Sequence, residues 1–130
     1  MTLLDSSFLY AYYRNHDVHH GMAVEQAFQY QNESAHIPLE IFEELITLIG
    51  RKQGSDEAVK IGKLLLSEKS AVHILSMIPS QFLKTWQLFQ TLSPYSLSYV
   101  DCLLITLARE YQCSILTFDK AILEYMKKDG

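Results

Sequence analysis

The sequence predicts an α/β protein in which a short, mainly parallel sheet lies between two layers of helices. Short apolar segments of β type alternate along the chain with longer segments whose apolar residues have helical spacing. Consecutive parallel strands need helix-length crossovers, and each expected strand is followed by a helical segment. We therefore expect a three-layer fold with four short strands, or five if another strand follows the last helix.

Polar and glycine-containing turns divide the first half of the chain. Asp17 is the predicted N-cap of the second helix, which ends near Gln31. Pro38 is placed to begin the third helix, and Gly54 to end it. Ser55, followed by acidic residues in the first turn, caps the fourth. The expected strands here are residues 3–5 and 35–37, and the expected helices begin near residues 8, 17, 38 and 55.

The second half repeats the alternation. Residues 72–78 form the third expected strand, and residues 79–92 a helix in which Phe82, Trp86 and Phe89 have the spacing of core residues. We expect these aromatic side chains to be packed in the interior, with base stacking as the alternative. The expected elements that follow are a helix over residues 98–111, a strand over residues 114–118 and a helix from 120 to about 127.

The composition is typical of one globular domain spanning residues 1–130, with 48% hydrophobic and 20% charged residues. The N-terminus lacks the features of a signal peptide, and no apolar run approaches the roughly 18 residues of a membrane span. We expect a soluble, cytoplasmic protein with no membrane contact. Cys102 and Cys113 are expected to be buried free thiols. The net charge of −4 does not favour a general nucleic-acid binder, but a carboxylate cluster that binds a cation would also make the sequence acidic.

Four acids are placed where they could converge. Asp5 and Asp119 end the first and last expected strands, at the sheet edge where ligands of open α/β proteins bind. Asp101 lies beside the apolar stripe of its helix, and Glu44 lies between Ile41 and Leu48 on the third helix. Each acid also has a structural explanation, because Asp5, Asp101 and Asp119 could cap helices and Glu44 could be solvated.

A cluster of carboxylates must protonate or bind a cation, because like charges repel. Oxygen ligands without matching His or Cys residues favour Mg²⁺ or Mn²⁺ over zinc. Such ions activate water and polarise phosphate, so the predicted chemistry is phosphodiester hydrolysis.

Other polar residues have weaker claims. The group His16, Asp17, His19 and His20 is predicted to be a polar helix start, since no second cluster matches it as a metal site. Glu40 and Glu43 lie farther from the apolar stripe than Glu44 and are expected to be solvated, although either could assist the site.

Four segments in this order resemble the PIN-domain family, and within it the small toxins of VapC type. The segments are LLDSSFL (residues 3–9), IFEELITL (41–48), LSYVDCLLITLARE (97–110) and ILTFDKAI (115–122). The resemblance implies that Asp5, Glu44, Asp101 and Asp119 form an acidic metal-binding quartet, with Ser6 and Thr117 as supporting hydroxyls. The final edge strand common in the family is expected to be short or absent, because the last helix ends close to Gly130.

The resemblance also implies a function, a Mg²⁺- or Mn²⁺-dependent endoribonuclease that is often a homodimer and often silenced by a small antitoxin. Two alternatives stay open. One is a catalytically inactive module that binds RNA or protein, and the other is a phosphatase or DNA nuclease that uses the same acids.

Overall fold

The computed structural model describes residues 1–129, apart from the side chains of Ser93 and Asp129. It has four parallel strands in the order β3-β2-β1-β4, which confirms the expected α/β fold. The strands are β1 (Thr2–Leu4), β2 (Ala35–Pro38), β3 (Val72–Leu75) and β4 (Ser114–Leu116). The order changes direction at β1, since β2 and β3 lie on one side of it and β4 on the other. Such a switch point is where open α/β sheets bind ligands.

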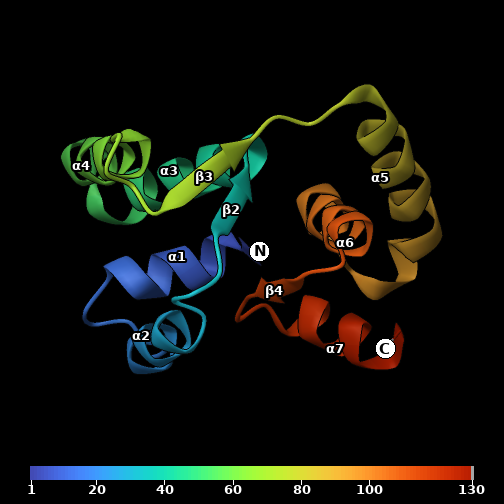
Figure 1. Ribbon diagram of the computed structural model, residues 1–130, viewed down its shortest axis with the longest axis horizontal. Helices are drawn as coiled ribbons and strands as arrows, with labels where there is room; N and C mark the ends of the chain where they lie inside the picture. Colours follow the sequence, from blue (N-terminus) through green and yellow to red (C-terminus); the bar gives the residue numbers. More distant parts are fainter. Residues whose placement is uncertain (130) are drawn as a thin grey trace.

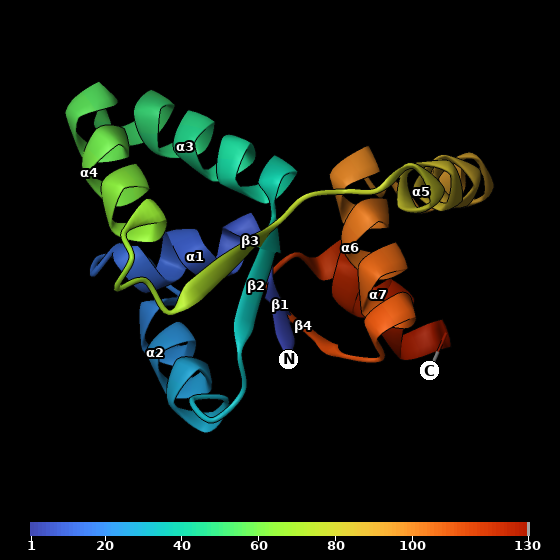
Figure 2. The same ribbon diagram turned by 45° about the horizontal axis from the view of Figure 1, so that its top comes forward.

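Seven helices cover the two faces of this sheet in the described part of the chain. Figure 2 shows α1, α2, α3 and α4 on one side and α5, α6 and α7 on the other. Figure 1 shows α6 enclosed between the sheet and α5, and eight consecutive residues of α6, Asp101 to Ala108, are buried. The helices are α1 (Ser6–Tyr13), α2 (His20–Gln29), α3 (Leu39–Gln53), α4 (Ser55–Leu66), α5 (Pro79–Leu92), α6 (Tyr99–Tyr111) and α7 (Lys120–Asp129), with a 3-10 turn at Ser93–Tyr95.

Strands β3 and β4 are shorter than predicted, because each ends where its neighbour turns away. In β3 the last paired residue is Leu75, opposite Pro38, which has no backbone N–H and leads directly into α3. In β4 the last residue is Leu116, whose carbonyl accepts the Asp5 N–H at 3.0 Å just before the chain enters α1. Residues 76–78 and 117–118 therefore belong to loops. A fifth strand after α7 would involve Gly130, which lies outside the described residues.

The second helix begins two residues later than predicted, with its N-cap at His19 instead of Asp17. Asp17 is not its N-cap, because its carboxylate accepts the backbone N–H of His19 at 2.9 Å and its carbonyl accepts that of His20 at 3.0 Å. These bonds close a turn before the helix, so α2 begins at His20 with His19 in the cap position.

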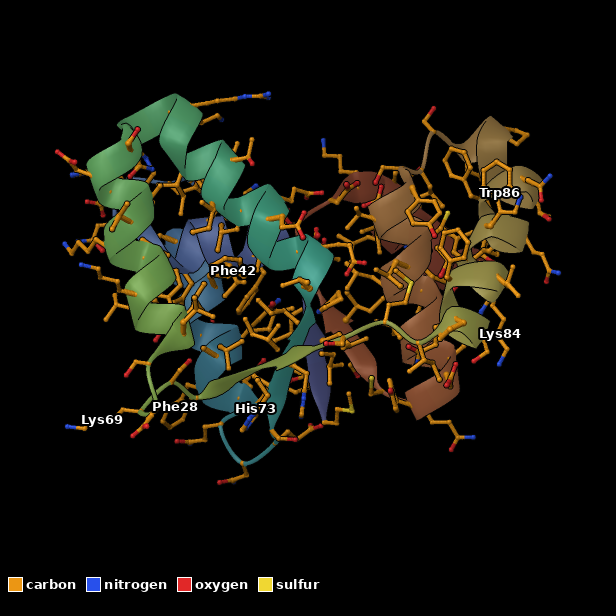
Figure 3. The ribbon with its side chains drawn as sticks, turned by 90° about the horizontal axis from the view of Figure 1, so that it is seen from above. Phe28, Phe42, Lys69, His73, Lys84 and Trp86 are labelled. Atoms are coloured by element: carbon orange, nitrogen blue, oxygen red, sulfur yellow. The ribbon has the colours of Figure 1, made fainter. Side chains whose placement is uncertain are left out.

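The expectation that the α5 aromatic residues are interior was wrong for two of the three. The exposed fraction is 50% for Phe82 and 47% for Trp86, while Phe89 is partly buried. The buried face of α5 is formed instead by Gln81, Thr85 and Leu92. Helical spacing identifies side chains on one face but does not show how far that face is covered, and Trp86 lies on the outer side of the molecule (Figure 3).

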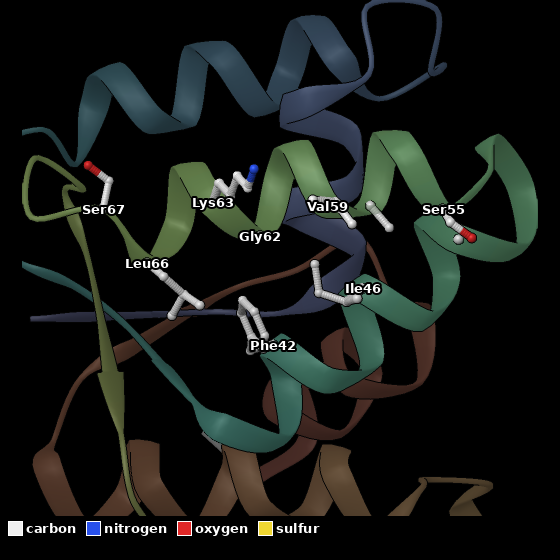
Figure 4. A pocket seen from close by; sticks show the side chains of 10 residues that line it. Phe42, Ile46, Ser55, Val59, Gly62, Lys63, Leu66 and Ser67 are labelled. Atoms are coloured by element: carbon white, nitrogen blue, oxygen red, sulfur yellow. The ribbon is translucent and has the colours of Figure 1, made fainter.

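Helices α3 and α4 form a hairpin around Gly54, whose φ of 97° is strained for residues with a side chain. The two helices approach closely, since a Cβ placed at Gly62 would lie 3.3 Å from Ile46 Cδ1. A pocket of about 640 Å³ lies between them, with Phe42, Ile46, Val59 and Leu66 in its lining (Figure 4).

The two cysteines are free thiols, as predicted. Cys102 is buried and Cys113 partly buried. Burial raises the pKa of each thiol, to about 11 for Cys102.

Within residues 1–129, none of the helices combines the length and the apolar character needed to cross a membrane.

Candidate active site

Asp5 follows β1 and occupies the N-cap position of α1, but it does not cap that helix. Its Oδ2 atom accepts hydrogen bonds from Ser7 Oγ at 2.8 Å and from Thr117 Oγ1 at 2.7 Å. Only 3% of Asp5 is exposed, so these two hydroxyls hold its carboxylate in a fixed position. The capping explanation for Asp5 is therefore wrong in this structure.

The same hydroxyls join the loop after β4 to the start of α1. Thr117 Oγ1 accepts the backbone N–H of Asp119 at 2.9 Å, and Ser7 Oγ accepts that of Phe118 at 3.0 Å. The loop is thereby tied to the end of β1. Asp119 also caps α7, because its Oδ1 accepts the Ala121 N–H at 2.9 Å. Asp119 is therefore a helix cap, as one of the two explanations expected. It also lies near Asp5, because Thr117 Oγ1 contacts both residues.

Glu44 reaches this edge of the sheet from α3, which begins directly after β2. Its Oε1 atom accepts a hydrogen bond from Ser6 Oγ, the residue that follows Asp5. Ser6 is 6% exposed, whereas Glu44 lies on the exposed side of its helix. The contact connects α3 to the start of α1.

Asp101 lies in the first turn of α6 and forms the predicted capping box with Ser98. Its N–H donates to Ser98 Oγ at 3.1 Å, and its Oδ2 accepts the Ser98 N–H at 2.9 Å. Burial raises the pKa of Asp101 to about 6, the Ser98 hydrogen bonds oppose that rise, and the negative charges of Asp119 and Asp5 add to it. These electrostatic effects indicate that the three aspartates face a common region.

All six predicted side chains thus lie around the carboxyl ends of β1 and β4. They come from four separated segments of the chain, at residues 5–7, 44, 101 and 117–119. Each acid already accepts a hydrogen bond from the protein. Within residues 1–129, no group of three or more His, Cys, Asp and Glu side chains stands in a metal-holding arrangement. Metal binding by the quartet therefore stays a prediction.

The structure adds two residues that the sequence analysis did not assign to the site. Ser7, rather than Ser6, contacts Asp5. The sequence feature that could have identified it is the pair of serines directly after the first strand. Glu40 is not simply solvated as predicted, because its Oε1 atom is buried and without a hydrogen-bond partner. Glu43 is exposed, in agreement with the prediction.

The histidines near Asp17 make contacts within the fold. The His19 ring stacks on Phe118 with ring centroids 4.6 Å apart. A ring nitrogen of His20, Nδ1, lies 2.8 Å from the carbonyl oxygen of Ala11. These contacts pack the start of α2 against α1 and against the loop that carries Asp119.

The fold and its acidic edge define a class, an open α/β protein with a cluster of carboxylates at the switch point of a parallel sheet. The PIN domain family model matches residues 2–128. The chain belongs to the PIN domain family. A comparison with curated proteins finds no match.

Two solved structures share the fold. The crystal structure of VapC20 from Mycobacterium tuberculosis, described as a sarcin-ricin loop cleaving toxin, superposes with a TM-score of 0.83 at 19% identity; the match covers 96% of this chain and 95% of that one. A toxin-antitoxin complex from Klebsiella pneumoniae has a TM-score of 0.64 at 14% identity, covering 92% of this chain and 87% of that one. At these identities the likeness concerns the fold.

Proposed function

We propose that this PIN-domain protein is a metal-dependent endoribonuclease and the toxin of a toxin–antitoxin pair. One observation supports the proposal: Asp5 and Asp119 add to the pKa rise of Asp101 near the switch point of the sheet, and Glu44 accepts a hydrogen bond from Ser6, the residue after Asp5. Membership of the PIN domain family and the likeness to the VapC20 toxin fold support the same function. We further propose that residues 1–130 act as one domain and that the protein works in the cytoplasm.

Asp5, Glu44 and Asp101 would hold a divalent cation, and Asp119 would complete the site or hold a second ion. The donors are all oxygens, which suits Mg²⁺ or Mn²⁺. Burial is the main cause of the raised pKa of Asp101, and the charges of Asp119 and Asp5 add to it; a cation would relieve that repulsion. When bound, the ion supplies a Lewis acid that activates water and polarises the phosphate.

The chain's own contribution is to position these carboxylates. Ser7 and Thr117 orient Asp5, and Thr117 also fixes the backbone at Asp119. Ser6 restrains Glu44, and Ser98 restrains Asp101. The serine contacts use Oε1 of Glu44 and Oδ2 of Asp101, so the other oxygen of each carboxylate would remain to bind the ion.

An antitoxin is the proposed regulator. The Klebsiella pneumoniae structure is a toxin-antitoxin complex with the same fold, which supports a protein partner for this chain. The pocket between α3 and α4 offers an apolar contact surface, lined in part by Phe42, Ile46, Val59 and Leu66 (Figure 4). Val59 and Leu66 are 53% and 63% exposed, so a partner helix would remove apolar area from water there.

We also propose a homodimer that pairs through α5. Phe82, Leu83 and Trp86 on this helix are 50%, 57% and 47% exposed, and the rings of Trp86 and Phe89 are stacked 6.0 Å apart. Contiguous exposed apolar side chains mark interaction surfaces. Figure 3 shows Trp86 on the outer side of the molecule, away from α4.

The test is cleavage of a mixed-sequence RNA by the purified protein with Mg²⁺, Mn²⁺ or EDTA, beside Asp5→Asn. Asp56→Asn is the matched control, because Asp56 is an exposed acid in the first turn of α4. The proposal expects metal-dependent cutting that is lost in Asp5→Asn and kept in Asp56→Asn. Cutting of DNA or of a phosphomonoester in preference to RNA would favour the phosphatase or DNA nuclease alternative. Binding without cutting under any ion would favour the inactive module.

A further inference from the structure

A pocket of about 450 Å³ runs along one face of α3 and reaches α6. We call it the α3 pocket. Its lining includes Glu44, one of the predicted site acids, and Val100, the residue before Asp101 on α6. The pocket is lined by Glu40, Glu43, Glu44, Thr47, Leu48, Arg51 and Val100.

Two buried polar atoms near the α6 end of this pocket have no hydrogen-bond partner among the described residues. One is Oε1 of Glu40 and the other is the hydroxyl oxygen of Tyr99. The pKa of Tyr99 is raised by its burial and then by the charge of Glu40, so the two side chains are near each other. Unsatisfied buried polar groups are costly and uncommon in native proteins. This carboxylate oxygen therefore lacks a hydrogen-bond donor, and Glu40 is a residue of the pocket lining.

Arg51 provides a positive charge at the other end of the α3 pocket. It is exposed, and no ion pair involves it among the described side chains. Seven residues separate it from Glu44, which is about 10 Å along a helix. Among the residues that line the α3 pocket, Arg51 is the basic one.

Resting on the proposed function, we propose that the α3 pocket is a nucleotide subsite beside the cleaved phosphodiester. Glu40 accepts a hydrogen bond from the exocyclic amino group of a base, and Arg51 binds a backbone phosphate. Carboxylates recognise amino groups on base edges, and arginine pairs well with phosphate. Single-stranded RNA presents such edges because its bases are unstacked and accessible. The subsite therefore favours adenine, cytosine or guanine over uracil at one position.

The phosphate contact is tested by binding of a fluorescent single-stranded RNA in EDTA, measured by anisotropy across a salt series. Arg51→Gln is compared with Lys69→Gln, which removes the same charge from the turn after α4, far from α5 and α6 (Figure 3). A lost phosphate contact weakens binding several-fold and makes the slope of log affinity against log salt shallower by about 0.7. The control should match wild type. An unchanged affinity and slope in Arg51→Gln would overturn this half of the proposal.

The base contact is tested by mapping cleavage sites for Glu40→Gln and for the control Glu68→Gln, an exposed acid outside the pocket. The wild type and the control should discriminate against uridine at one position beside the cut. Glu40→Gln should reduce that discrimination by roughly 5-fold or more, because an amide can donate to the uracil carbonyl as well as accept. Equal discrimination in all three proteins would contradict the proposal. Complete loss of cleavage in Glu40→Gln would also contradict it, since Glu40 would then belong to the ion site.

The two arms separate this inference from the proposed function. RNA binding in EDTA does not require cleavage, so the Arg51 result stands even if the wild type cuts no RNA. If the wild type binds RNA in EDTA but cleaves none with any ion, the nuclease function is refuted and the phosphate contact can still hold. Normal cleavage with no effect of either substitution would refute the subsite and keep the nuclease function.

Discussion

Replacing Thr117 by valine removes one hydroxyl from the centre of the site while keeping the shape of the side chain. Thr117 is 5% exposed, and its Oγ1 atom makes two hydrogen bonds at once. It donates to the carboxylate of Asp5 at 2.7 Å and accepts the backbone N–H of Asp119 at 2.9 Å. The substitution leaves Asp5 with the single bond from Ser7.

The expected cost follows from these two bonds. A hydrogen bond to a charged group contributes about 1.5–3 kcal/mol and an ordinary one about 0.5–1.5 kcal/mol. The free energy of unfolding should therefore fall by about 2–4 kcal/mol. The bond to Asp5 is buried, so water would recover little of its loss, whereas the Asp119 N–H is partly buried and could recover some by bonding to water.

Urea unfolding at fixed protein concentration measures the change, with Thr91→Val as the control. Thr91 is exposed, and its hydroxyl donates at 3.0 Å to the Gln87 carbonyl one turn earlier in α5. Its replacement should change the free energy of unfolding by less than about 0.5 kcal/mol. If Thr117→Val also stayed within that range, the inference that Thr117 links β1 to the β4–α7 loop would be refuted.

Three further predictions concern the site, the assembly and the pH response. Asp101→Asn should keep the helix cap, because an amide oxygen still accepts the Ser98 N–H. The same variant should reduce the kcat of RNA cleavage by about 100-fold or more. Cleavage at the wild-type rate would show that Asp101 is not part of the site. Trp86→Glu should convert a homodimer to a monomer in light scattering, because it places a charge in the apolar α5 face, and an unchanged mass would exclude pairing through that face. Burial lowers the pKa of His36 from its ordinary 6.5, with help from His73 and the N-terminal ammonium, so the native protein binds fewer protons than the unfolded chain. The contribution of His36 to the free energy of unfolding should be complete above about pH 6.5 and be lost as the pH falls below it. Unfolding experiments at several pH values test this, and a His36→Gln variant with the same pH dependence as wild type would contradict it.

The sequence was most informative where local chemistry decides the structure. Ser98 and Asp101 have the spacing of a capping box, and both bonds of that box are present. The alternation of short apolar strands with helices was sufficient for the α/β class. Asp5 and Asp119 were correctly placed at one sheet edge, because parallel strands with helical crossovers must end on the same side.

Features that depend on neighbours distant in sequence were not predictable in the same way. The aromatic face of α5 has core spacing, but periodicity does not say whether another layer covers that face. The strands end at Leu75 and Leu116 because their partners turn away, which the apolar runs alone do not reveal. The role of Ser7 depends on Thr117, 110 residues away. The burial of one Glu40 oxygen depends on the packing of α3 near α6, which no local pattern reports.

The central claim is that four acids from separate segments form one cation site, and Mn²⁺ binding by calorimetry tests it most directly. The comparison is between Glu44→Gln and Glu43→Gln, two identical charge changes on adjacent residues of α3. Both side chains are exposed, but Glu44 accepts a hydrogen bond from Ser6 beside Asp5. We predict that Glu44→Gln weakens Mn²⁺ binding by at least about 10-fold while Glu43→Gln binds as the wild type does. Equal Mn²⁺ affinity in the wild type and Glu44→Gln would contradict the assignment of this acid, and no Mn²⁺ binding by the wild type would contradict the site itself.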